Sequence, residues 1–233
     1  MVALETNRSL LTAHLGDALE QGICPICYLA SEAEYRYLDT LLYEKMNNGA
    51  VRAALARSRG FCRYHTFRLI DIGGYGTNVK LAILYKDLVS AITDEVAALK
   101  DRGATGGPAV EDCPACRVVS ESEKTYMHVL RVSLENEEGR AAYRRSFGLC
   151  MPHFFRVYDG ASRATRALLK EDQTQRLEAL SQDLAEFIRK SVTKDETFGS
   201  ERSAWQRVIQ LYAGTPGENI RKPNRERIPH LIR

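Results

Sequence analysis

The feature that most constrains this chain is a pair of short motifs that occurs twice. Cys24-Pro-x-Cys27 is followed by Cys62-x-x-His65, and the same order returns as Cys113-Pro-x-Cys116 and Cys150-x-x-His153. All six cysteines of the chain fall in these motifs. We see no export signal near the N-terminus, so this spacing indicates metal or thiol chemistry rather than a disulfide framework.

The two pairs of motifs are copies of one ancestral unit. A shift of 88 residues matches Arg52-Ala-Ala, Arg57, Ser58, Gly60, Cys62 and His65 with Arg140-Ala-Ala, Arg145, Ser146, Gly148, Cys150 and His153. A shift of 89 residues matches Cys24, Pro25, Cys27, Ser31, Glu32, Glu34 and Tyr37 with Cys113, Pro114, Cys116, Ser120, Glu121, Glu123 and Tyr126. Two repeats are too few for a solenoid, so we expect a duplicated unit with approximate internal two-fold symmetry.

Each repeat supplies three cysteines and one histidine, which suit a borderline-soft cation such as Zn²⁺ in a tetrahedral site. We expect each Cys-Pro-x-Cys motif and the Cys-x-x-His motif that follows it to hold one ion. The expected ligands are Cys24, Cys27, Cys62 and His65 in the first repeat, and Cys113, Cys116, Cys150 and His153 in the second. Two zinc ions per chain are favoured, and an iron–sulfur cluster is the alternative because clusters also accept histidine.

The distance between the two motifs of a repeat creates a geometric tension. The intervening stretch has 34 residues in the first repeat and 33 in the second. Its closure cost rises only logarithmically with length, and structural zinc contributes on the order of 10 kcal/mol or more. A helix from Tyr28 to Met46, however, would carry the chain about 28 Å away from Cys27. Residues 48–61 would then have to bring it back.

Apolar residues recur at helical spacing along most of the chain. The clearest series are Leu38, Leu41, Leu42 and Met46; Leu81, Leu84, Leu88 and Ile92; Tyr126, Leu130 and Leu134; Leu177, Leu180 and Leu184; and Trp205, Val208, Ile209 and Tyr212. Each series predicts one apolar helix face. We therefore predict an all-α fold with a first helical metal-binding repeat at 1–101, a second at 102–195, and a C-terminal helix with a basic, proline-containing tail at 196–233.

Composition narrows the classes of function. The net charge of +3 is only a slight excess, whereas a nucleic-acid binder is expected to carry a basic stripe, so nucleic acid is an unlikely partner. The N-terminal residues lack the pattern of a signal peptide, and the apolar run at 81–85 is too short to span a bilayer. We expect a cytoplasmic protein without a membrane span.

The motifs carry a resemblance to a known family. With Cys24-Pro-Ile-Cys27, Phe61-Cys62-Arg-Tyr-His65 and their duplicates, the chain resembles prokaryotic proteins of unknown function that share paired Cys-Pro-x-Cys and Gly-(Phe/Leu)-Cys-x-x-His motifs. The segment from Trp205 to Gly214 resembles the same group. This resemblance covers most of the chain and implies a helical fold with two metal-type sites. It implies no activity.

Closed four-ligand sites favour a non-enzymatic binding or adaptor module with an unknown protein partner. An iron–sulfur electron-transfer or redox-sensing protein is the alternative function.

The pairs Cys62–His65 and Cys150–His153 are weak candidates for a nucleophile and its base, because few enzymes need two copies of one dyad. Thiol–disulfide exchange at the Cys-x-x-Cys pairs would leave the matched histidines unexplained. For the repeated acidic residues Glu32, Glu34, Glu121 and Glu123, we prefer a solvated helix face to a role beside the metal.

Overall fold

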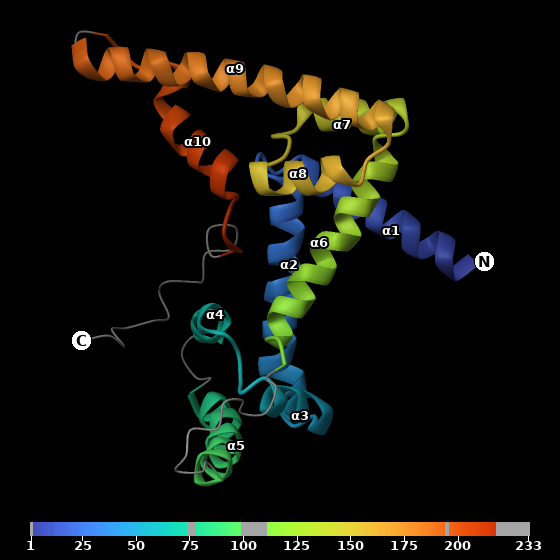
Figure 1. The fold of residues 1–233 in the computed structure, drawn as a ribbon, viewed down its shortest axis with the longest axis vertical. Helices are drawn as coiled ribbons and strands as arrows, with labels where there is room; N and C mark the ends of the chain where they lie inside the picture. Colours follow the sequence, from blue (N-terminus) through green and yellow to red (C-terminus); the bar gives the residue numbers. More distant parts are fainter. Residues whose placement is uncertain (1, 74–77, 99–110, 194–195, 218–233) are drawn as a thin grey trace. The chain divides into compact units, whose positions relative to one another are not determined.

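Helices are the only regular secondary structure in the part of the chain that the structure describes. This computed structural model describes residues 2–73, 78–98, 111–193 and 196–217, and no strand occurs within these ranges (Figure 1). The all-α prediction is therefore confirmed. Most of the expected connection at 102–112, and the basic tail beyond residue 217, lie outside the described residues.

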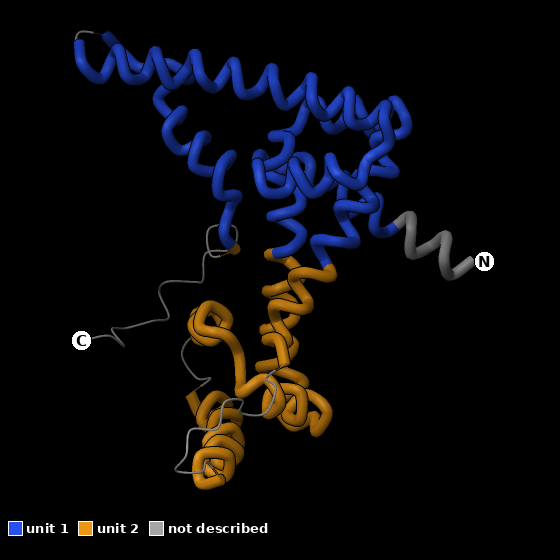
Figure 2. The backbone as a smooth tube through the Cα atoms, in the orientation of Figure 1, with its two compact units in different colours: residues 1–30, 122–216 blue, residues 31–121, 217–233 orange. Residues whose placement is uncertain are grey.

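The chain forms two compact units, shown in different colours in Figure 2. Unit 1 contains residues 1–30 and 122–216, and unit 2 contains residues 31–121 and 217–233. Two helices contribute to both units: α2 (Pro25–Thr40) begins in unit 1 and ends in unit 2, and α6 (Pro114–Ser133) does the reverse. The internal two-fold symmetry and the division at residues 101 and 195 remain predictions.

Each unit has its own helices and its own core. Unit 1 adds α1 (Val2–Leu19), α7 (Glu137–Arg145), α8 (Met151–Asp159), α9 (Arg163–Thr193), the 3-10 turn η2 (Ser200–Ser203) and α10 (Ala204–Ala213). Unit 2 adds the π-helical turn η1 (Leu41–Lys45), α3 (Gly49–Arg57), α4 (Arg63–Gly73) and α5 (Asn78–Ala97). The core of unit 1 includes Leu15, Ile26, Leu130, Leu134, Tyr143 and Leu169, and that of unit 2 includes Leu38, Leu41, Leu42, Leu55, Leu69 and Leu84.

The duplicated arginines stabilise the turns that precede α3 in the first repeat and α7 in the second. Arg52 donates from Nε to the Met46 carbonyl at 2.9 Å, and Arg140 donates to the Leu134 carbonyl at 2.8 Å. These carbonyls lie where a helical run ends, so they lack an intrahelical partner and need another donor. The copied arginines thus have a structural role that is the same in both repeats.

A copied serine and a copied glycine precede each Cys-x-x-His motif and form the turn before it. The Ser58 hydroxyl donates to the Leu55 carbonyl at 3.2 Å, and the Ser146 hydroxyl donates to the Tyr143 carbonyl at 2.7 Å. Two residues later, Gly60 and Gly148 have φ values of 91° and 82°. Because a side chain would be strained at such angles, glycine allows the sharp turn that starts each cysteine–histidine helix.

The apolar series on α10 is divided between core and surface. Ala204 and Leu211 are buried against α9, beside Leu180. Trp205, Ile209 and Tyr212 are 47%, 55% and 66% exposed, so most of the predicted stripe faces outward rather than into a core. Among the described residues, no helix combines the length and the apolar character that a membrane span requires.

Candidate metal centre

The eight expected ligands gather into two groups, which are assembled differently from our expectation. Cluster 1 consists of Cys24, Cys27, Cys150 and His153, and cluster 2 consists of Cys62, His65, Cys113 and Cys116. Within each group, the potential ligand atoms all lie within 4.8 Å of one another. Each cluster therefore takes Cys-Pro-x-Cys from one repeat and Cys-x-x-His from the other, and the prediction that each repeat closes its own site is wrong.

Helix length explains the exchange. The helical run from Pro25 to Lys45, formed by α2 and η1, has 16 and 5 residues and so spans about 30 Å. The chain does not return from its end to Cys27. Cys62 and His65 instead meet the second Cys-Pro-x-Cys motif within unit 2, and Cys24 and Cys27 meet the second Cys-x-x-His motif within unit 1. Exchange thus removes the need for a long return segment.

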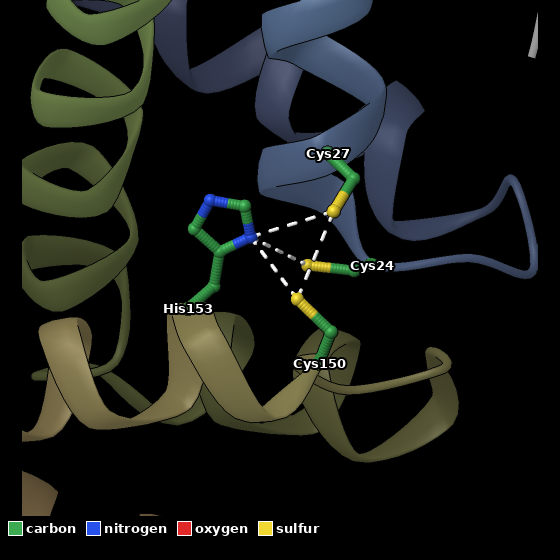
Figure 3. A group of neighbouring side chains, drawn as sticks. All are labelled: Cys24, Cys27, Cys150 and His153. Carbon is green, nitrogen blue, oxygen red and sulfur yellow. Dashed lines mark hydrogen bonds between the residues drawn. The ribbon is translucent and has the colours of Figure 1, made fainter. Parts of the chain in front are cut away.

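Cluster 1 lies where two helices of unit 1 begin (Figure 3). His153 Nδ1 lies 3.5 Å from the sulfur of Cys24, 3.4 Å from that of Cys27 and 3.1 Å from that of Cys150. The sulfurs of Cys27 and Cys150 are 3.7 Å apart. Cys24 immediately precedes α2, and Cys150 is the N-cap of α8. Helix N-termini favour negative charge, so this position suits thiolate ligands.

Cluster 2 repeats this geometry in unit 2. His65 Nδ1 lies 3.2 Å from the sulfur of Cys62, 3.6 Å from that of Cys113 and 3.3 Å from that of Cys116. The sulfurs of Cys62 and Cys116 are 3.7 Å apart. One imidazole nitrogen thus faces three sulfurs in each cluster. This arrangement is typical of a shared ion, whereas an isolated nucleophile and base would pair one sulfur with one ring.

The separations can be compared with those around a single tetrahedral ion. Zinc–sulfur bonds of about 2.3 Å and zinc–nitrogen bonds of about 2.0–2.1 Å give sulfur–sulfur edges of about 3.8 Å and sulfur–nitrogen edges of about 3.6 Å. The sulfur–sulfur distances of 3.7 Å agree with the first value. The sulfur–nitrogen distances, 3.1–3.6 Å, are at or slightly below the second. Both clusters could therefore hold one metal ion each.

A glutamate lies behind each histidine, on the side away from the sulfurs. His65 Nε2 is 3.3 Å from Oε1 of Glu34, and His153 Nε2 is 3.3 Å from Oε1 of Glu123. Glu34 is only 2% exposed. The expectation that the repeated glutamates form a solvated helix face is therefore wrong for Glu34 and for Glu32, which is 7% exposed, and Glu123 is half-buried beside His153. The contact of His153 with Glu123 has hydrogen-bond geometry, and a carboxylate so placed fixes the ring orientation and makes Nδ1 a better ligand.

An arginine completes each chain of contacts, and neither arginine was predicted to belong to a site. Arg68 donates from Nε to Glu34 at 3.3 Å, and Arg156 donates to Glu123 at 2.6 Å. Both arginines lie three residues after the histidine of their motif, at the same shift of 88 residues as the copied ligands. This shared shift is the sequence signal that could have identified the two arginines as part of the repeated unit. Arg68 is buried and also donates to the carbonyl of Gly217 at 3.1 Å.

The interactions within cluster 2 favour a protonated His65 beside a deprotonated Cys113. Burial opposes protonation of His65, but hydrogen bonds with Cys113, Glu34 and Cys62 outweigh it and raise the pKa of the imidazole to about 10. Burial also opposes ionisation of Cys113, yet its hydrogen bond with His65 lowers the pKa of the thiol to about 6. Cys116 is exposed, but partial desolvation of its sulfur and the hydrogen bond with Cys62 raise the pKa of its thiol to about 12. An imidazolium thus stabilises one thiolate, and a bound cation would replace its proton.

Cluster 1 shows the same pattern. Burial opposes protonation of His153, but hydrogen bonds with Cys150, Cys24 and Glu123 raise its pKa to about 11. Cys24 is buried, and its hydrogen bonds with Cys150, Cys27 and His153 nevertheless lower the pKa of its thiol well below the usual range. Hydrogen bonds with Cys150 and Cys24 raise the pKa of Cys27 far above that range. Both clusters therefore attract positive charge among their sulfurs.

The glutamate beside cluster 1 provides a test of its role. Because Glu123 orients the ligand ring, Glu123→Ala should weaken metal binding at cluster 1 by about 10- to 100-fold. Competition against a chromophoric chelator measures the affinity of both clusters in one titration, and cluster 2 should be unchanged. Glu178→Gln, an exposed position on α9, is the matched control. Unchanged affinity in Glu123→Ala would show that the contact has no part in binding.

Comparison with known proteins agrees with the motif resemblance. The model of DUF6062, described as a family of unknown function, matches residues 7–219. This match includes all eight cluster residues and the α10 segment, so the resemblance inferred from the motifs is confirmed. Neither a curated protein nor a solved structure matches the chain.

Proposed function

Because the chain belongs to DUF6062, a family whose function is unknown, we propose a function from the geometry of the two clusters. The protein is a non-enzymatic helical binding module in which one zinc ion per cluster stabilises each unit. The observation that carries the proposal is that four protein ligands converge in each cluster within 4.8 Å of one another. Four such ligands fill a tetrahedral zinc ion and leave no position for a substrate.

The spacing of the ligands supports a single ion over the iron–sulfur alternative. A four-iron cluster distributes its ligands over separate irons. It therefore spreads them more widely than one ion does. The sulfur–sulfur distances of 3.7 Å in both clusters are close to the edge expected for one zinc ion. Zinc also has no redox chemistry of its own, in keeping with a structural role.

The binding part of the proposal is supported by the surface of α10. Trp205, Ile209 and Tyr212 follow one another at helical spacing and are all exposed. Trp205 also lines a groove of about 700 Å³ with Phe187 and Phe198. Exposed apolar patches of this kind are typical of protein interaction sites.

Metal analysis tests the proposal. Purified protein should contain two zinc ions per chain and be colourless. After exchange of zinc for cobalt, both clusters should show the intense visible absorption of tetrahedral cobalt with thiolate ligands. Fewer than two zinc ions per chain, or a brown iron-containing protein after anaerobic purification, would contradict the proposal. A weak cobalt spectrum, typical of higher coordination with bound water, would instead favour a catalytic metal.

A further inference from the structure

The two clusters share their ligands and spacing but differ in how well they are covered. All four residues of cluster 1 are buried. In cluster 2, Cys62 and Cys113 are half-buried and Cys116 is exposed. Since the two sites are copies within one chain, this difference in cover is the main chemical difference between them. It decides which sulfurs a dissolved reagent can reach.

The cover over cluster 1 includes the end of α10. Gly214 has a φ of 78° and closes the helix by donating its amide to the Gln210 carbonyl at 3.0 Å. A side-chain carbon at Gly214 would lie 2.9 Å from the sulfur of Cys27 and 3.4 Å from that of Cys150. The backbone of this turn therefore lies directly against the two sulfurs. Only glycine allows so close an approach at this backbone angle.

We propose that Cys116 is a modification site for hydrogen peroxide and related small peroxides, and that its oxidation releases the metal of cluster 2. The inference rests on the proposed zinc sites. It draws on two observations, the exposure of Cys116 and the 3.7 Å distance between its sulfur and that of Cys62. Oxidation follows thiolate character and access, and a metal-bound cysteine is already a thiolate.

The reaction proceeds in two balanced steps. The Cys116 thiolate attacks one peroxide oxygen, the oxygen–oxygen bond breaks, and a sulfenic acid and hydroxide form. The Cys62 thiolate then attacks the sulfur of Cys116, a disulfide forms, and a second hydroxide leaves. Two thiolates lose two electrons in total, and peroxide gains them. Only His65 and Cys113 would then remain to hold an ion at cluster 2, which would favour its release into solution.

The experiment compares the two clusters in one molecule. Zinc-loaded protein is treated with hydrogen peroxide, released zinc is followed with a metallochromic dye, and disulfides are located by peptide mass spectrometry. One equivalent of zinc should leave at least about ten-fold faster than the other, in step with a Cys62–Cys116 disulfide. Release of both equivalents at one rate, or a first disulfide without Cys116, would overturn the inference. Fewer than two zinc ions before treatment would instead contradict the proposed function.

A variant of the cover tests its protective role. Gly214→Ala places a methyl group against the sulfur of Cys27 and strains the turn, so it should lift the backbone from cluster 1. The slow equivalent should then leave faster, while the fast one is unchanged. Gly49→Ala, where an added carbon meets nothing within 4 Å, is the matched control and should alter neither rate. If Gly214→Ala leaves the slow rate unchanged, the end of α10 does not protect cluster 1.

Discussion

Replacing Cys24 and Cys150 together by serine should lower the zinc content from two ions per chain to one. These residues are partners in cluster 1, so the double variant destroys one site and leaves cluster 2 complete. Replacing Cys24 and Cys62 together should remove both ions, because these residues belong to different clusters. Native mass spectrometry and metal analysis of the two variants measure the difference directly.

The two double variants form a matched pair with opposite expectations. If each repeat closed its own site, the Cys24 and Cys62 variant would keep one ion, and the Cys24 and Cys150 variant would keep none. That result would contradict the exchanged pairing. Cadmium-substituted wild-type protein gives a second measurement that needs no substitution. Each cadmium signal should couple to protons of three cysteines and one histidine, and one signal should connect Cys24 with Cys150.

Removing both metal ions should unfold most of the chain. A structural zinc ion contributes on the order of 10 kcal/mol, whereas a typical protein is stable by only about 5–15 kcal/mol. For a chain of this length, the loss of ~10 kcal/mol with one ion would lower the melting temperature by about 20–40 °C, and the loss of both ions exceeds the stability of a typical protein. Circular dichroism melts before and after treatment with a strong zinc chelator measure this change.

Refilling the sites provides the control for chelation. Added zinc should restore the helical signal and the melting temperature. Added magnesium should not, because it prefers oxygen ligands and octahedral geometry. If the chain keeps the same melting temperature once metal analysis shows that both ions are gone, the clusters do not stabilise the fold.

The sequence predicts the eight cluster residues and the helical class because both depend on local patterns. Helical periodicity fixes which face of each helix is apolar, and the repeated motifs identify the residues that gather. These local patterns do not show which Cys-x-x-His motif joins which Cys-Pro-x-Cys motif. The pairing depends on how far the helical run from Pro25 to Lys45 carries the chain, which is a long-range property. The predicted helix already implied that distance, but no local signal showed which motif lies at its end.

The environment of the repeated glutamates also could not be predicted from local sequence patterns. A charged residue on a helix is usually solvated, so the repeated Glu34 and Glu123 gave no clear indication of their environment. In the structure, Glu34 is buried between His65 and Arg68. Its burial is possible because both neighbours can carry positive charge. The shift of 88 residues marks Arg68 as a copied residue, but only the three-dimensional arrangement shows that it contacts Glu34, which lies 34 residues away in the sequence.

The exchanged pairing places cluster 2 inside cluster 1 in the order of the sequence. Every residue of cluster 2 lies between Cys27 and Cys150 in the sequence. A ribosome that adds about 5–20 residues per second therefore delivers the full ligand set of unit 2 some seconds before His153 appears. Once cluster 2 has closed, the free chain between Cys27 and Cys150 is effectively shorter, and closing cluster 1 costs less entropy. We therefore expect the residues of cluster 2 to gather before those of cluster 1, so that Cys24 and Cys27, the first cysteines to be made, are among the last to meet their partners.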